Sequence, residues 1–315
     1  MSARVDVSVL VPAKDEAENL RLFVELCAET FRTARERYEV IVIDDGSTDN
    51  TAAVLTDLAR EYPFVRVVKH RTQRGIADAL RSGYVAAQAD ILVFYPADLQ
   101  FKPEDIPRLV APIVAGESDM VTGYKQGVYE KAFVSRVYNG LSRLLFHIPV
   151  RDLNNVKAYR REIMAEQPAR PDWHRYMIVL AAANGYTVTE IPVPLYPRHA
   201  GKSKFGLSRI PVGVLDMLSV WFELTFAKKP LLAFGMLGAV LFAIGFLAGL
   251  LELVLLFAGR ADFAVRPVWS VIQTSMILGS VFFATGLLSE QVAVLRAEQR
   301  ELRRVLDERR TTPPG

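Results

Sequence analysis

Two long apolar runs in the C-terminal third constrain this chain more than any other feature. Leu231 to Gly259 contains a single ionisable residue, Glu252, and Pro267 to Leu288 contains none. Each run exceeds the roughly twenty residues that a helix needs to cross a bilayer. A buried core helix of a soluble protein would account for one such run but poorly for two in tandem. Because residues 260–266 are too few for a domain, the runs predict a transmembrane helical hairpin.

Basic residues predict the orientation of this hairpin. Lys228 and Lys229 precede it, whereas the connecting loop carries only Arg260 and Arg266, offset by Asp262. Positively charged flanks tend to stay on the cytosolic side of a membrane. The open end of the hairpin is therefore expected in the cytosol, at the plasma (inner) membrane if the source is bacterial. The arginines that follow the hairpin are Arg296, Arg300, Arg303, Arg304, Arg309 and Arg310.

Composition divides the chain into four predicted segments. The apolar stretch Val7 to Val11 is too short for a secretory signal, so we expect the first segment to stay in the cytosol. Ile210 to Phe226 is amphipathic and aromatic-rich, as in a helix lying in the membrane interface. A charge at Glu252 is costly inside lipid, so this residue should lie near the far interface or face a partner helix. Glu252 and the predicted helical tail therefore leave room for a homo-oligomer. The segments are a cytosolic domain (1–206), an interface helix region (207–229), two transmembrane helices (230–289) and a charged cytosolic tail (290–315).

The first segment alternates short β-branched runs with helical patterns. Such alternation on short connections predicts an α/β domain with a mainly parallel sheet. Cys27, the single cysteine, lies within the first helical pattern and is expected to be buried. The predicted strands are Val5–Val11, Val40–Ile43, Val65–Lys69 and Asp90–Tyr95, and the predicted helices lie within Glu16–Tyr38, Thr48–Glu61 and Ile76–Gln88.

Polar clusters follow three of the predicted strands. They begin at Pro12, Asp44 and Asp98. Ligands of open α/β sheets bind beyond the carboxyl ends of the strands, so the clusters predict one binding site there. The chain carries 38 basic against 35 acidic residues, a balance that gives no reason to expect a nucleic-acid partner.

The residue types in these clusters suggest their chemistry. The run from Asp44 to Asp49 has too many carboxylates for a phosphate-cradling glycine loop, but it can accept hydrogen bonds from a base or ribose. Asp98 and Gln100 alternate along the chain and would point the same way if the backbone stays extended. A carboxylate with an amide oxygen suits a hard divalent cation. The alternative is the start of a helix before Pro103.

Five tracts of the sequence carry a family resemblance together, and they read VSVLVPAKDEAENL, VIVIDDGSTDNT, PADLQFKPEDIPRL, RDLNNVKAYRRE and PVPLYPRHAGKSKFG. They occur in the order seen in family 2 glycosyltransferases. The chain most resembles the branch of dolichol-phosphate mannose synthases and polyprenyl-phosphate glycosyltransferases. That resemblance implies a GT-A type nucleotide-binding domain, a Mg²⁺ or Mn²⁺ ion, and inverting transfer of a sugar from a UDP-hexose or GDP-mannose to a polyprenyl or dolichyl phosphate lipid.

The resemblance also implies roles for individual residues. Asp44 would support the ribose or diphosphate, and Asp98 and Gln100 would hold the metal. The chain departs from the pattern at Pro96, where a first motif acid is usual, and its RDLNNVK tract is shorter than the usual version, which clouds any role for Asn154 and Asn155. The residues implied to line the nucleoside pocket are Pro12, Ala13, Asp15, Glu16 and Asp45.

A lipid phosphate acceptor would need cations around it rather than a general base. Its second pKa lies near 6, so it is largely dianionic at neutral pH. Arg198, Lys202 and Lys204 come directly before the interface helix, where such a phosphate would be presented. The alternative is that these cations bind anionic headgroups without catalysis. The resemblance adds Lys125, Arg136 and Arg143 on the acceptor side, and Asp98, Arg198 and Lys204 as the catalytic set.

Two further interpretations stay open. Asp152 either positions Arg151 or contacts the sugar, or else forms a purely structural ion pair. The histidines are too scattered for a metal site, and no Ser/His/Asp nucleophile is predicted.

A catalytically silent membrane protein that binds a nucleotide sugar or lipid is the alternative to an enzyme. Pro96 favours the silent protein, whereas the presence of Asp98, Gln100, Arg198 and Lys204 favours the enzyme.

Overall fold

The computed structural model shows two compact units, Met1–Val214 and Leu215–Gly315. The first unit is built on a seven-stranded sheet in the order β3-β2-β1-β4-β6-β5-β7. Neighbouring strands are parallel except β6, which is antiparallel to both β4 and β5. The structure describes residues 4–126, 140, 145–146, 150–153, 155–167, 173–197, 199, 209–226, 229–258 and 266–311.

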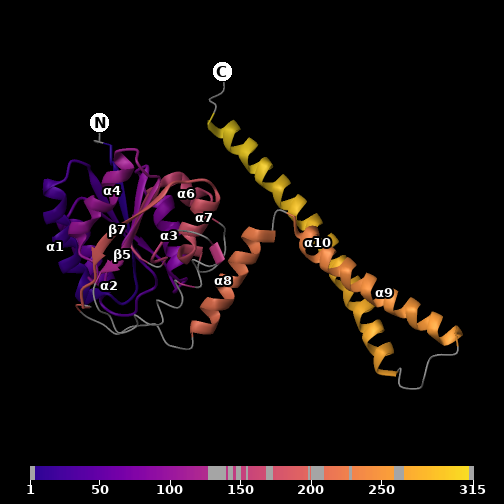
Figure 1. Cartoon of the computed structure of the whole chain (residues 1–315). Helices are drawn as coiled ribbons and strands as arrows, with labels where there is room; N and C mark the ends of the chain where they lie inside the picture. Colours follow the sequence, from indigo (N-terminus) through magenta and orange to yellow (C-terminus); the bar gives the residue numbers. More distant parts are fainter. Residues whose placement is uncertain are drawn as a thin grey trace. The chain divides into compact units, whose positions relative to one another are not determined.

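Helices cover both faces of this sheet (Figure 1). The strands are β1 (Val7–Ala13), β2 (Tyr38–Asp44), β3 (Val65–Lys69), β4 (Ile91–Phe94), β5 (Met120–Gln126), β6 (Lys157–Arg160) and β7 (Val188–Pro194). The helices of this unit are α1 (Ala17–Thr33), α2 (Thr51–Glu61), α3 (Ile76–Ala86), α4 (Ile106–Val114), α6 (Arg161–Ala165) and α7 (Met177–Ala183), with short 3-10 turns η1 (Pro103–Asp105) and η2 (Trp173–Arg175).

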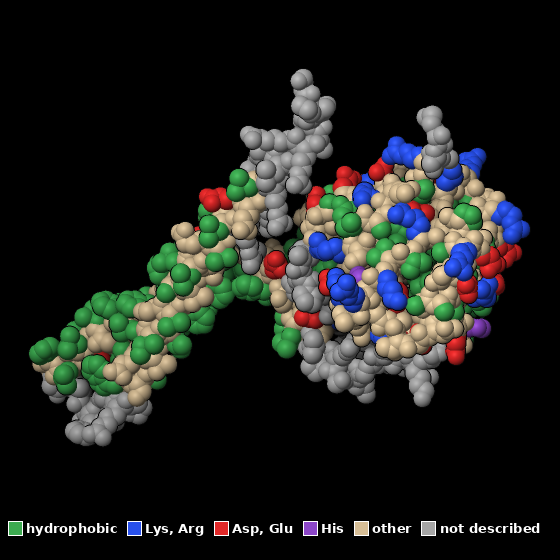
Figure 2. All heavy atoms as spheres, turned by 180° about the vertical axis from the view of Figure 1, so that it is seen from behind, with side chains coloured by type: hydrophobic (Ala, Val, Ile, Leu, Met, Phe, Trp, Pro, Cys, Tyr) green, Lys and Arg blue, Asp and Glu red, His purple; other side chains and the backbone are tan. Residues whose placement is uncertain are grey.

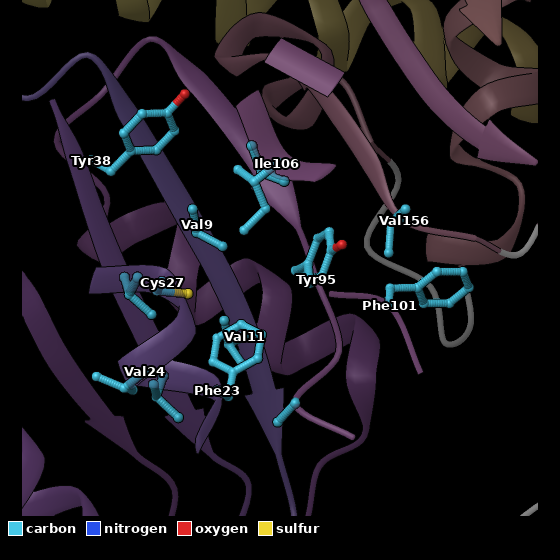
Figure 3. Packing of buried hydrophobic residues seen from close by; sticks show 14 of the residues in the cluster. Val9, Val11, Phe23, Val24, Cys27, Tyr38, Tyr95, Phe101, Ile106 and Val156 are labelled. Carbon is cyan, nitrogen blue, oxygen red and sulfur yellow. The ribbon is translucent and has the colours of Figure 1, made fainter. Parts of the chain in front are cut away.

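The β-branched runs are buried on both faces because alternate side chains meet different helices. Val9 and Val11 point into a core that also contains residues of α1, α2 and α4, including Phe23 and Cys27 (Figure 3). The opposite face packs on α3, where a Cβ on Gly83 would lie 2.9 Å from the Cδ1 of Ile43. Helix and sheet therefore approach closely there. The predicted burial of Cys27 is confirmed, since its side chain is fully enclosed.

The four predicted strands and the mainly parallel sheet are confirmed, with shifts at the ends. Helix α2 begins at Thr51 rather than Thr48 because the preceding residues form a turn. Strands β5, β6 and β7 were not anticipated from sequence. β6 is four residues long with a charge at each end, and β7 contains two prolines, so neither shows an apolar run.

The second unit contains the helical hairpin. Most of α8 (Arg209–Phe226) belongs to it, followed by a π-helical turn, η3 (Leu231–Gly235), then α9 (Met236–Phe257) and α10 (Arg266–Thr311). Two stretches, Leu231–Phe257 and Val268–Gln299, are long and apolar enough to cross a membrane. Hydrophobic side chains dominate their visible surface (Figure 2). The predicted tail continues α10 without a break up to Thr311.

Glycines bring the two hairpin helices into backbone contact. A Cβ on Gly238 would lie 2.5 Å from the amide nitrogen of Phe283, and one on Gly279 would lie 2.5 Å from that of Phe242. Neither position has room for a side chain. At the start of the hairpin, the Leu231 amide donates a hydrogen bond to the Glu290 carboxylate at 3.2 Å. The hairpin is thus fixed by close helix packing and by this bond.

Candidate functional site at the carboxyl edge of the sheet

The sheet order brings the three polar clusters to one edge. β1 lies between β2 and β4 and is parallel to both. In this register Ala13 pairs with Asp44, and the Asp45 amide donates to the Ala13 carbonyl at 2.8 Å. The residues after β1, β2 and β4 therefore share the carboxyl edge, as the sequence predicted.

Asp15 joins the loop after β1 to the loop after β2. Its Oδ1 accepts the Thr48 amide at 2.7 Å, and its own amide donates to Ser47 Oγ at 2.9 Å. Lys14 approaches the Asp15 carboxylate at 3.3 Å and donates to the Gly46 carbonyl at 2.6 Å. The bond from the Thr48 amide is the main reason that the pKa of Asp15 is lowered to about 2. Asp15 thus orders the loops of the predicted nucleoside pocket.

Asp45 is buried and holds the loop between β3 and α3. Its Oδ1 accepts the Arg74 amide at 2.8 Å and its Oδ2 accepts the Gly75 amide at 2.8 Å. His70 Nδ1 lies 2.8 Å from the same Oδ1, and His70 Nε2 lies 2.8 Å from Ser82 Oγ. The structure therefore contains a Ser/His/Asp chain that sequence reasoning missed. With both its oxygens accepting backbone amides, Asp45 anchors the loop in this chain.

The buried Asp44 carboxylate at this edge can accept a further hydrogen bond. Its side chain is 1% exposed, and Oδ1 accepts the Ser47 amide at 2.8 Å. Its Oδ2 has no hydrogen-bond partner within the described part of the chain. A buried carboxylate oxygen left without a donor is costly, which makes this oxygen suited to an N–H or O–H group of a ligand.

The other predicted pocket residues occupy the first loop. Pro12 and Ala13 end β1, where Ala13 is buried and Pro12 is partly exposed. Glu16 accepts the side-chain amide of Asn19 at 2.6 Å, and its own amide donates to Thr51 Oγ1 at 3.0 Å. Glu16 therefore helps to join the start of α1 to the start of α2.

Asp98 and Gln100 lie in a turn after β4 rather than in an extended segment. Leu99 between them has φ +57°, and the Gln100 amide donates to Asp98 Oδ1 at 3.2 Å. The condition of an extended backbone is therefore not met. The burial still alternates, with Pro96, Asp98 and Gln100 partly exposed and the residues between them buried. Both predicted metal ligands thus keep access to solvent.

The described residues fit a divalent cation only as a site completed by substrate. No group of three or more His, Cys, Asp or Glu side chains suitable for a metal occurs among them. Asp98 and Gln100 offer one carboxylate and one amide oxygen at the sheet edge. Mg²⁺ is usually held by one or two carboxylates together with substrate phosphates and water. Pro96 contributes no ligand, so the donor set suits an ion that binds with a diphosphate.

Lys125, near the end of β5, faces Asp152, which lies in the loop before β6. Their Nζ and Oδ2 atoms are 3.1 Å apart. Glu190 of β7 accepts the Arg151 amide at 2.6 Å, and the Arg151 guanidinium lies 4.6 Å from the centre of the Tyr124 ring. Arg151, beside Asp152, thus contacts both β5 and β7. The remaining predicted acceptor and catalytic cations, Arg136, Arg143, Arg198, Lys202 and Lys204, and also Asn154, lie outside the described residues.

Lys157 and His174 are buried groups that the sequence did not single out as a pair. Lys157 is 1% exposed, and its ammonium donates to the carbonyls of Leu153 and His174, each at 3.2 Å. Burial lowers the pKa of Lys157 to about 8 and that of His174 to about 3. A lysine at the start of a strand, directly between the apolar residues Val156 and Ala158, was the available signal.

The family follows from a sequence match that spans this edge. Residues 8–161, which include the clusters after β1, β2 and β4, match the model of Glycosyl transferase family 2. The chain carries a family 2 glycosyltransferase domain. The predicted resemblance is therefore confirmed, and the match covers all but the last strand of the sheet.

Proteins related to this chain match most of its length. A dodecaprenyl-phosphate galacturonate synthase of Rhizobium johnstonii is 28% identical over 303 residues, which are 92% of this chain and 88% of that protein. An undecaprenyl-phosphate 4-deoxy-4-formamido-L-arabinose transferase of Enterobacter sp. is 28% identical over 93% of this chain and 90% of that protein. Glycosyltransferase AglD of Haloferax volcanii is 32% identical over 71% of this chain and 38% of its own length.

Solved structures confirm the fold of the glycosyltransferase domain. Glucosyl-3-phosphoglycerate synthase from Mycobacterium tuberculosis, crystallised with Mn²⁺, uridine diphosphate and glucosyl-3-phosphoglycerate, superposes with a TM-score of 0.57. The match covers 69% of this chain and 80% of that one at 20% identity. At such low identity the likeness establishes the fold, and the predicted GT-A type architecture is confirmed.

Proposed function

We propose that this chain transfers a sugar from a nucleotide sugar, a UDP-hexose or GDP-mannose, to a polyprenyl or dolichyl phosphate at a membrane. The observation that carries the proposal is the convergence of Asp44, Asp98 and Gln100 at one sheet edge of a family 2 glycosyltransferase that also holds an apolar helical hairpin. Relatives that match nearly the full chain are named for acting on dodecaprenyl or undecaprenyl phosphate. We infer an integral membrane enzyme with its sheet domain in the cytosol.

The donor would bind beyond β1, β2 and β4. The spare, buried Oδ2 of Asp44 can accept an N–H or O–H of the nucleoside. Asp15 and Asp45 fix the loops around it through backbone amides. A divalent cation held by Asp98 and Gln100 would supply positive charge at the leaving diphosphate.

The reaction would proceed by direct displacement. An oxygen of the lipid phosphate attacks the anomeric carbon, and the bond from that carbon to the diphosphate breaks, so the configuration inverts. A phosphate that is already dianionic needs no base to remove a proton. The cations predicted on the acceptor side, including Lys125, would lower the cost of bringing two anions together.

Transfer by the full-length chain in detergent or vesicles tests this function. The assay contains Mg²⁺ or Mn²⁺, a short-chain polyprenyl phosphate and a panel of UDP-hexoses and GDP-mannose, with release of UDP or GDP as the readout. We expect release that requires the lipid phosphate and one donor. Asp98→Asn should reduce kcat/KM by about 100-fold or more, the scale of losing one charge-stabilising group. Comparing the anomeric configuration of donor and product would test inversion.

Asp57→Asn is a matched control for the Asp98 variant. Asp57 is an exposed carboxylate on α2 with only a 4.0 Å approach to Arg60, so its replacement should leave kcat/KM within about twofold. Equal loss in both variants would show that Asp98 has no special role. Nucleotide binding without transfer to any lipid phosphate would favour instead the silent binding protein that Pro96 suggests.

A further inference from the structure

Lys157 lies where the donor and acceptor sides of the sheet edge meet. It begins β6, pairs in register with Phe94 at the end of β4, and follows the loop that carries Asp152. Its neighbour across the other ladder is Thr122 of β5, three residues before Lys125. Lys157 thus pairs, through its backbone, with both the strand that precedes Asp98 and the strand that presents Lys125.

The region around the Lys157 ammonium carries excess positive charge. Its hydrogen bonds go to two neutral carbonyls, of Leu153 and His174. Asp152 favours the charged form of Lys157 and Lys125 opposes it, and these two residues already pair with each other at 3.1 Å. From η2, His174 is held neutral by burial, with Lys157 and Arg175 adding to the effect.

We propose that Lys157 is a positioning residue for the acceptor phosphate, acting through Leu153 and Asp152, which precede β6. Its ammonium fixes the Leu153 carbonyl and hence the place of Asp152, which in turn holds Lys125 toward the edge of the sheet. The buried positive charge also favours an anion beside Lys125, because charges interact strongly where water is excluded. This inference rests on the proposed function and extends it to a residue that the family resemblance did not supply.

Arg161 provides a matched control at the opposite end of β6. It also donates to backbone carbonyls, those of Ala87 at 2.9 Å, Ala89 at 3.2 Å and Tyr84 at 3.1 Å. Replacing Arg161 by methionine therefore removes hydrogen bonds comparable to those that Lys157→Met removes. Because Arg161 lies at the amino end of β4, its replacement should weaken the fold without changing phosphate binding.

Binding of a short-chain polyprenyl phosphate to the full-length chain, with the uncharged polyprenol as reference, tests the role of Lys157. We expect Lys157→Met to weaken phosphate-dependent binding by about tenfold or more, while UDP or GDP binding changes by less than twofold. Lys157→Arg, which keeps the charge, should restore most of the affinity. Arg161→Met should lower the thermal midpoint and leave both affinities within twofold.

The pH dependence adds a readout that a merely structural lysine would not move. As the pH rises through about 8, Lys157 loses its proton, so affinity for the phosphate should fall in the wild type. The fall should be absent in Lys157→Arg, whose guanidinium stays charged. Unchanged phosphate affinity in a folded, nucleotide-binding Lys157→Met protein would overturn the positioning role. Equal wild-type affinity for polyprenol and polyprenyl phosphate would overturn the proposed acceptor, and this inference with it.

Discussion

Carboxylates that accept backbone amides assemble the loops at the carboxyl edge. Asp15 accepts the Thr48 amide, Asp45 accepts two amides of the β3–α3 loop, and Glu190 accepts the Arg151 amide. Hydrogen bonds to a charged group are stronger than those between neutral groups. Several acidic residues at this edge are therefore needed to shape the site before any substrate binds.

Replacing Asp45 by alanine should destabilise the domain. The Arg74 and Gly75 amides and the buried His70 would lose their acceptor, and each unpaired buried donor costs about 1–3 kcal/mol. We expect a loss of at least about 2 kcal/mol in the free energy of unfolding. Chemical denaturation of the full chain in detergent measures it.

Asp49→Ala is the comparison for Asp45→Ala. Asp49 accepts the Thr51 amide at 3.0 Å from an exposed position, so its loss should cost only about 1 kcal/mol. Similar losses in the two variants would argue against an anchoring role for Asp45.

Acid should weaken the link made by Asp15. Its pKa is about 2 in the folded chain and about 3.9 in an unfolded one. A lowered pKa stabilises the fold above pH 4, and this contribution disappears as the pH falls toward 2. Between these values, the stability of the wild type should fall more steeply than that of Asp15→Asn. Thermal unfolding across this pH range measures the difference, and parallel curves would contradict it.

The sequence predicts which residues reach the edge better than what each side chain does there. Asp44, Asp98 and Gln100 could be placed because the carboxyl ends of parallel strands coincide. The Asp45–His70–Ser82 chain could not, because its members follow β2, follow β3 and lie on α3, and only the folded domain brings them together. The turn at Leu99 was equally hidden, since a positive φ at leucine has no signal in the residue itself.

At the scale of elements, glycine contacts decide whether the hairpin can close. Gly238→Ala and Gly279→Ala should each separate α9 from α10, because their new Cβ atoms would lie 2.5 Å from backbone nitrogens of the facing helix. We expect a lower midpoint for loss of helicity in a detergent titration.

Gly249→Ala is the control within the same hairpin. Its Cβ would meet only the Ile272 Cγ2 atom, at 3.3 Å, a side chain that can shift. A midpoint equal to that of Gly238→Ala would show that close backbone approach does not limit hairpin stability.

Sequence patterns recovered the elements that bury an apolar face. The first four strands, their helices and the two apolar runs all have the required periodicity or length. Strand β6 was missed because it is short and is held by neighbouring strands on both sides. Strand β7 was missed because its two prolines, which an edge strand tolerates, interrupt the apolar pattern. Such elements are determined by the tertiary fold.

At the scale of the whole molecule, the single buried cysteine makes the membrane orientation measurable. Cys27 is fully enclosed and burial raises its pKa, so a thiol reagent should spare it in the folded chain. In intact cells, a membrane-impermeant maleimide should label Ala258→Cys, after α9, but leave Val85→Cys on α3 unlabelled. After lysis the reagent should label Val85→Cys, because Val85 is 75% exposed on the surface of its domain. Labelling of Val85→Cys before lysis would place the sheet domain outside the cytosol.

The π-helical turn η3 has a consequence for how this hairpin tolerates insertions and deletions. A π turn holds one residue more than an α turn, and one residue of an α-helix corresponds to about 100° of rotation. Deleting a single residue from Leu231–Gly235 would therefore convert the turn to α-helix and leave the angular phase between Pro230 and α9 nearly unchanged. Gly238 and Gly245 would still face α10. A deletion between these two glycines, within α9 itself, would instead rotate one relative to the other by about 100°. The π turn is thus the place where this hairpin best tolerates the loss of one residue.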